Sequence, residues 1–109
     1  MKKNDLIYLR HISSAISRIE EYSQNLNCKE FMNNYLLQDG IIRQIEIIGE
    51  ATKRLSEEFK KKHNEIPWKD IAGMRDKLIH DYFGVDLEAV WYTVEKDIPL
   101  LKNKLEHLQ

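Results

Sequence analysis

The spacing of the apolar residues constrains this chain more than any other feature of its sequence. Apolar side chains recur every three or four positions along most of the 109 residues, which is the period of one face of an α-helix. The pattern predicts helices over residues 5–26, 28–63, 67–83 and 87–108. Only four glycines and two prolines interrupt it, which is few for a β-rich protein of this size. We therefore expect an all-α fold, an up-and-down bundle of four to five helices.

Polar residues and prolines mark where several of these helices begin and end. Asn27, with Glu30 three positions later, has the spacing of a capping box at a helix start. Asp86 is a favoured N-cap for the last helix, and Gly84 is expected to end the helix before it. Pro67 suits a first helical turn, where the backbone N–H group needs no partner.

Two glycines and a proline lie inside the predicted helices. Gly40 is expected to bend or break the long second segment near residues 36–40, and Gly49 to let another helix approach closely. Pro99 removes a backbone donor from the last helix, so we expect a kink or a local break there.

Length, charge and cysteine content limit the possible functions. We expect one domain over residues 1–109. The 17 basic and 18 acidic residues give a net charge of −1, so any RNA binding needs a local basic patch. The single cysteine, Cys28, excludes an intrachain disulfide and a zinc site built from several thiolates. With no signal peptide and no apolar run of ~20 residues, a cytoplasmic protein without membrane contact is expected.

Arg75, His80 and Tyr82 form the cluster that points to chemistry. On an ideal helix Arg75 and Tyr82 share a face, and His80 lies to one side. Arginine offers paired donors to phosphate oxygens, and histidine acts as a general base or acid near neutral pH. Together they could cleave RNA by using its 2′-hydroxyl as the nucleophile. Because one histidine supplies only half of an acid–base pair, a homodimer that joins two such motifs would complete the site.

The spacing alone also allows a structural interpretation of the same residues, and slightly favours it. Arg75 would then form a surface ion pair, and His80 would lie near the carbonyl groups of a helix end.

The segment from Arg75 to Tyr82 resembles the R-x4-H-x-Y form of the motif that defines the HEPN superfamily. The likeness continues on both sides of the motif, in the order and spacing typical of the HepT-like family, over about residues 5–106. The stretches that carry it are Ile47–Ala51, Pro67–Trp68, Ile71–Arg75, Tyr82–Asp86 and Val90–Trp91.

This resemblance implies a HEPN-like bundle that acts as a metal-independent RNA endonuclease without a cofactor. It also implies a homodimer that is the toxin of a pair, with a minimal nucleotidyltransferase as antitoxin. Arg75 and His80 would be catalytic, and Asp76 would orient them, although the family often has Asn there. Tyr82 would accept AMP from the antitoxin, which adds bulk and negative charge beside the site. The alternative is a non-catalytic helical module that binds the nucleotidyltransferase or a second copy of itself.

Other charged residues allow two interpretations each. Glu50 either faces the site and tethers Arg75 or is a solvated carboxylate. Lys53 and Arg54 either extend an RNA groove or, as the pattern favours, belong to a simple charged face. Lys60–Lys62 are expected to be a solvated run at a helix C-terminus. The remaining histidines lack a partner at metal-ligand spacing, so no metal site is expected.

Overall fold

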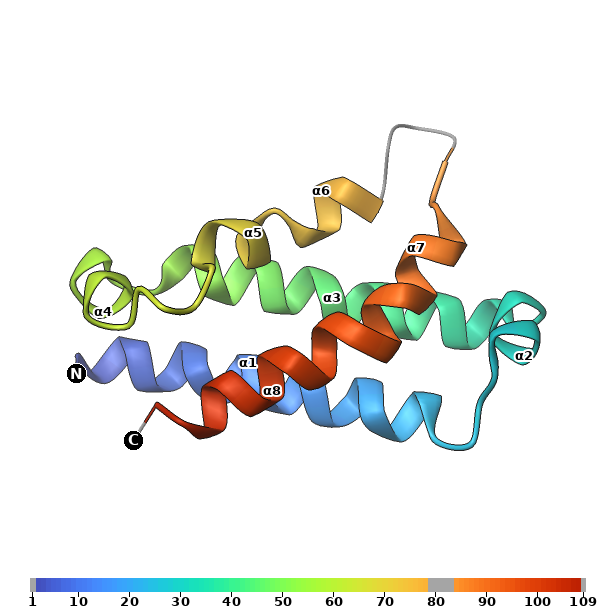
Figure 1. Cartoon of the computed structure of the whole chain (residues 1–109), viewed down its shortest axis with the longest axis horizontal. Helices are drawn as coiled ribbons and strands as arrows, with labels where there is room; N and C mark the ends of the chain where they lie inside the picture. Colours follow the sequence, from blue (N-terminus) through green and yellow to red (C-terminus); the bar gives the residue numbers. More distant parts are fainter. Residues whose placement is uncertain (1, 79–83, 109) are drawn as a thin grey trace.

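The computed structural model of the chain describes residues 2–78 and 84–108, and the elements that they form are all helical (Figure 1). The predicted all-α class is therefore confirmed. In chain order the elements are α1 (Lys3–Ser23), α2 (Cys28–Met32), α3 (Tyr35–Arg54), α4 (Glu57–Lys62), α5 (Trp68–Ala72), α6 (Met74–Leu78), α7 (Leu87–Tyr92), the π-helical turn η1 (Thr93–Asp97) and α8 (Ile98–Glu106).

The two long helices, α1 and α3, pack antiparallel and form the base of the bundle (Figure 1). The short helices α5 and α6 lie along α3, and α8 returns beside α1. The apolar faces of α1 and α3 meet in the centre of the core, where each contributes isoleucines that are almost completely buried: Ile12, Ile16, Ile19, Ile41, Ile45 and Ile48. Burial of such faces supplies most of the stability of a helical domain.

The single segment predicted over residues 28–63 is three helices. It begins as predicted, because Asn27 forms a capping box. The chain then breaks at Asn34 and at Ser56, whose side chains accept hydrogen bonds from backbone N–H groups three residues later. Each of these contacts starts a new helix by satisfying a donor that the helix itself leaves unpaired. Gly40, where the break was expected, lies inside α3, so that expectation was wrong.

The helix predicted over residues 67–83 is also interrupted, since Gly73 ends α5 and α6 begins at the next residue. The expected close approach at Gly49 is confirmed. A Cβ atom on Gly49 would lie 3.2 Å from the backbone oxygen of Ala72. The absence of a side chain at this position therefore lets α5 lie directly on α3.

The last part of the chain follows the prediction closely. Asp86 caps α7, with its Oδ1 accepting a hydrogen bond of 3.0 Å from the N–H of Ala89. The expected local break before Pro99 is the turn η1, and Pro99 lies in the first turn of α8. Proline has no N–H to donate to the carbonyl four residues earlier, so a widened turn at this point relieves the mismatch.

A buried carboxylate ties the first turn of α1 to the start of α4. Asp5 is only 2% exposed, and its two oxygens accept hydrogen bonds of 2.7 Å from the N–H and the hydroxyl of Ser56. Burial alone would raise the pKa of Asp5, but the hydrogen bonds from Ser56 and the charge of Lys2 outweigh it and hold the pKa below its ordinary value.

We predict that Asp5→Ala lowers the free energy of unfolding at neutral pH by about 1–3 kcal/mol, because it leaves the half-buried N–H of Ser56 without its acceptor. The pKa of Asp5 is lower in the folded than in the unfolded chain, so its contribution is present above the unfolded pKa and lost as the pH falls through the folded one. Urea unfolding across acidic pH should therefore show the two proteins converging. The exposed Asp39→Ala is the matched control, and a difference that stays constant in acid would contradict the assignment.

Candidate functional site

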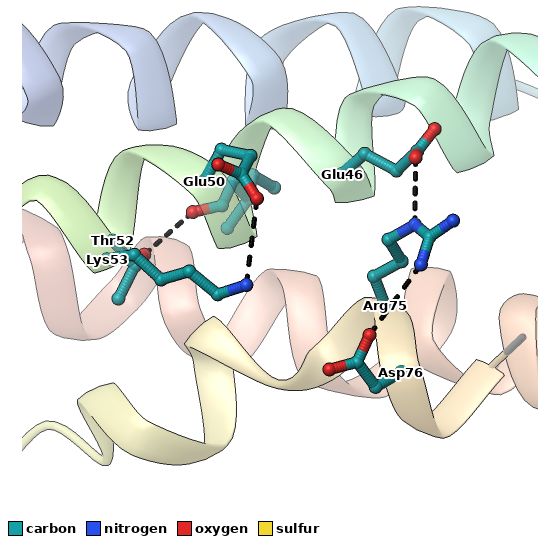
Figure 2. A network of polar contacts seen from close by, with 7 residues as sticks. Glu46, Glu50, Thr52, Lys53, Arg75 and Asp76 are labelled. Carbon is teal, nitrogen blue, oxygen red and sulfur yellow. Dashed lines mark hydrogen bonds and ion pairs between the residues drawn. The ribbon is translucent and has the colours of Figure 1, made fainter.

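Arg75 lies on the outer side of α6, because Met74 and Leu78 occupy the side that faces the core. Its guanidinium group reaches across to α3, where Nε donates a hydrogen bond of 2.8 Å to Oε2 of Glu46 (Figure 2). The side chain of Arg75 is 46% exposed and that of Glu46 is 30% exposed. The pair therefore lies at the surface, where a ligand can reach the cation.

A second carboxylate, that of Asp76, lies beside the same guanidinium group. Its Oδ1 atom is 3.6 Å from Nη1 of Arg75 (Figure 2), which is an ion-pair distance rather than a hydrogen bond. The hydrogen bond and charge of Glu46, with a smaller contribution from Asp76, raise the pKa of Arg75 above its usual value. Arg75 is therefore a permanent cation, and its direction is set by a residue of another helix.

The carboxylate that contacts Arg75 belongs to Glu46, one helical turn before Glu50, the residue considered for this contact from the sequence. Glu50 instead lies 3.6 Å from Nζ of Lys53 on its own helix, and both side chains are more than half exposed (Figure 2). Glu46 and Glu50 share one face of α3 because they are four residues apart. Sequence spacing finds that face but does not determine which of its carboxylates lies opposite α6.

His80 and Tyr82, the other two members of the candidate cluster, lie outside the described residues. The residues on either side of that stretch are described, and they are joined: the N–H of Asp86 donates a hydrogen bond of 2.9 Å to the carbonyl oxygen of Leu78. Leu78 and Asp86 therefore lie in contact at the end of α6 as described, three residues after Arg75.

The arrangement of Arg75 suits the binding of an anion such as a phosphate group. A guanidinium group presents a planar set of N–H donors, and a carboxylate that occupies Nε fixes the direction of the others. No three His, Cys, Asp or Glu side chains within residues 2–78 and 84–108 are grouped to hold a metal ion. No described helix has the length and apolar character needed to cross a membrane.

Comparison with known proteins gives matches over almost the whole chain. The family described as "Ribonuclease HepT-like" matches residues 12–108. A protein of Thermococcus cleftensis named "Probable ribonuclease HepT" is 48% identical over 109 residues, which are 100% of this chain and 99% of that relative. A protein of Caldanaerobacter subterraneus subsp. tengcongensis named "Putative RNase" is 43% identical, over 93% of this chain and 90% of the relative.

A longer relative also matches. The protein of Methanocaldococcus jannaschii named "Gamma-glutamylcyclotransferase and putative RNase" is 52% identical over 105 residues, which are 96% of this chain but 47% of the relative. The chain thus spans about half the length of that relative. No solved structure gives a significant match.

The contact between Arg75 and Glu46 can be tested without an activity assay. We expect Glu46→Gln to weaken the hydrogen bond to Nε of Arg75, because the amide carries no charge. The Nε–Hε signal of Arg75 in a ¹⁵N-correlated NMR spectrum should then shift and exchange faster with water. The thermal unfolding midpoint should change little, because the pair is exposed. Glu50→Gln is the matched control, and a larger effect from it than from Glu46→Gln would show that the wrong carboxylate had been assigned.

Proposed function

The chain belongs to the ribonuclease HepT-like family, and from this premise we propose that it is a metal-independent endoribonuclease and the toxin of a toxin–antitoxin pair. The family match over residues 12–108 carries the proposal. The exposed and oriented cation at Arg75 supports it, because cleavage of RNA requires a group that stabilises negative charge on phosphorus. His80 and Tyr82 follow Arg75 by five and seven positions in the sequence, and Leu78 and Asp86, on either side of them, are joined by a hydrogen bond.

In the proposed mechanism the imidazole of His80 removes the proton from the 2′-hydroxyl of RNA. The 2′-oxygen attacks the adjacent phosphorus, and the bond from phosphorus to the 5′-oxygen breaks. Arg75 stabilises the charge that develops on the non-bridging oxygens. Glu46 and Asp76 act as positioning residues that hold the guanidinium group. The products are a 2′,3′-cyclic phosphate and a 5′-hydroxyl, and the leaving oxygen requires a proton from a second acid.

A homodimer would supply that second acid as the His80 of the other copy. Exposed apolar side chains support self-association: Tyr35 and Leu36 are 78% and 82% exposed, and they are consecutive on the first turn of α3. Exposed apolar patches often mark surfaces that contact other proteins. The same helix carries Glu46 about three turns later, so a contact there would place a second copy near the site.

The partner in this proposal is a minimal nucleotidyltransferase that acts as the antitoxin. It would transfer AMP from ATP to Tyr82, with the phenolic oxygen attacking the α-phosphorus and pyrophosphate leaving. The modified residue would carry a negative charge close to Arg75 in the sequence. That charge would compete with RNA phosphates for the cation and block cleavage.

A specific observation favours the alternative, a non-catalytic interaction module. A hollow of about 460 Å³ lies between α6 and α8, with Met74, Leu78 and Leu101 among its lining residues. At the same hollow, Tyr92 is 59% and Leu100 is 56% exposed. An apolar groove of this kind suits a helix of a nucleotidyltransferase partner.

We predict that His80→Ala lowers the RNA cleavage rate by about 10²–10⁴-fold, the usual contribution of a general base. Arg75→Ala should lower it by about 10²–10³-fold. Wild-type cleavage should persist in EDTA and leave 2′,3′-cyclic phosphate ends, measured by gel electrophoresis and mass spectrometry. His11→Ala and Arg18→Ala, which replace exposed residues of α1, are the matched controls.

The same variants separate the enzyme from the interaction module. If Arg75→Ala keeps the melting temperature and the dimer but abolishes cleavage and toxicity, the catalytic role stands. If it unfolds the protein or dissociates the dimer while His80→Ala cleaves RNA at the wild-type rate, Arg75 is structural and the proposal fails.

Modification of Tyr82 has its own test. Incubation with the cognate nucleotidyltransferase and ATP should add the mass of AMP to the peptide that contains Tyr82, and cleavage should stop. Tyr82→Phe should remain unmodified and active. Tyr35→Phe and Tyr92→Phe are the controls, because both residues are exposed tyrosines of the described chain. AMP found on either of these residues, or on none, would refute the assignment.

A further inference from the structure

Four lysines from three helices line one hollow of the surface. The hollow has a volume of about 510 Å³ and lies where the end of α3, α4 and α5 meet. Lys53 comes from α3, Lys60 and Lys61 from α4, and Lys69 from α5. We call the hollow that these four lysines line the lysine hollow. The fold brings them together although 16 positions separate Lys53 from Lys69 in the sequence.

The positive charge of the lysine hollow is only partly neutralised. Lys53 lies 3.6 Å from Glu50 and Lys60 lies 3.3 Å from Glu57. The side chains of Glu50 and Glu57 are 64% and 80% exposed, so solvent screens both pairs and an incoming anion can compete with the carboxylates. Glu57 also lines the hollow, and the side chain of Lys60 is 19% exposed, so Lys53, Lys61 and Lys69 are the more accessible cations. Lys61 has no carboxylate partner among the described residues, and neither does Lys69. Since the whole chain carries a net charge of −1, this concentration of cations is a local feature.

The lysine hollow and Arg75 lie along the same face of α3. Glu46, Glu50 and Lys53 follow one another at intervals of four and three residues, and Figure 2 shows them on the side of α3 that faces α5 and α6. Seven residues separate Glu46 from Lys53, which is about 10 Å along a helix. Ala72 also lines the hollow, and it precedes Arg75 by three residues. The hollow and the contact of Arg75 with Glu46 are therefore about two helical turns apart along one face of α3.

We infer that the lysine hollow binds phosphate groups of single-stranded RNA on one side of the bond that is cut at Arg75. This inference rests on the proposed function and names how the substrate is held. Lysine ammonium groups act as mobile point charges that attract phosphates without reading bases. Trp68, the aromatic residue of the hollow, is buried, and its indole N–H donates to the carbonyl of His63 at 2.9 Å. It therefore offers no face for base stacking, so the contact is independent of sequence.

The test is the double substitution Lys61→Gln/Lys69→Gln, which removes the two charges that have no carboxylate partner in the part of the chain that the structure describes. The probe is a short fluorescent oligoribonucleotide with 2′-O-methyl groups, which lacks the nucleophile and stays uncut by the wild-type protein. Anisotropy titrations at several KCl concentrations should show that the variant binds the probe more weakly, on the order of tenfold at low salt. The slope of log K against log [KCl] should be smaller in magnitude by about 1.4, which is about 0.7 for each lost phosphate contact. With cleavable RNA, KM should rise while kcat stays near the wild-type value.

The matched control is Lys29→Gln/Lys96→Gln, which changes the total charge equally. These lysines are exposed on α2 and η1, outside the lysine hollow, and the control should bind the probe as the wild type does. Equal loss of affinity in both double variants would overturn the inference, because only total charge would then matter. Unchanged affinity and salt slope in Lys61→Gln/Lys69→Gln would also overturn it. Melting temperatures check that both variants are folded.

The outcome is distinguishable from failure of the proposed function. If the wild type cleaves RNA but the variant in the hollow binds the probe normally, the hollow is not an RNA contact and the nuclease proposal stands. If that variant loses affinity for the probe and the wild type cleaves no RNA, the RNA contact stands and the nuclease proposal fails. If Lys61→Gln/Lys69→Gln binds RNA normally but no longer binds the purified nucleotidyltransferase, the inference is overturned in favour of an acidic protein partner.

Discussion

The close contact between α3 and α5 at Gly49 determines where the charged groups of the site lie. Because this residue has no side chain, the backbone of Ala72 approaches to a distance that leaves little room for a Cβ atom. Three residues after Ala72, the chain places Arg75 against Glu46. Three residues before it, Lys69 enters the same hollow as Lys53. A wider separation of the two helices would move both groups of charges away from α3.

The sequence was sufficient to predict the helical class and the helix starts at Asn27 and Asp86, because these depend on contacts within four residues. It did not predict the breaks at Asn34 and Ser56. Capping side chains are frequent in this sequence, and tertiary packing decides which of them begins a helix. The contact of Asp5 with Ser56 spans 51 positions of the sequence, so it has no local signal.

The candidate site was predictable in a similar, partial way. The chemistry of Arg75 follows from its residue type, and the face of α3 that carries Glu46 and Glu50 follows from helical periodicity. Which of the two glutamates meets Arg75 depends on where α6 lies along α3, and that position is set by packing between segments that are distant in the sequence. The same holds for the lysine hollow. Its four lysines belong to separate charged segments of the sequence, and they come together only when α4 and α5 fold against the end of α3.

The pairing of Arg75 with Glu46 has a consequence for how long a product would stay bound. Glu46 occupies Nε, whereas Nη2 has no acceptor among the residues that the structure describes. A phosphate can therefore bind the outer edge of the guanidinium group while the carboxylate keeps the inner one. Because Arg75 already forms an ion pair with Glu46, its attraction for a phosphate is weaker than that of an isolated arginine. Under the proposed mechanism, this weaker binding of phosphate by Arg75 favours release of the cut strand and a further round of cleavage.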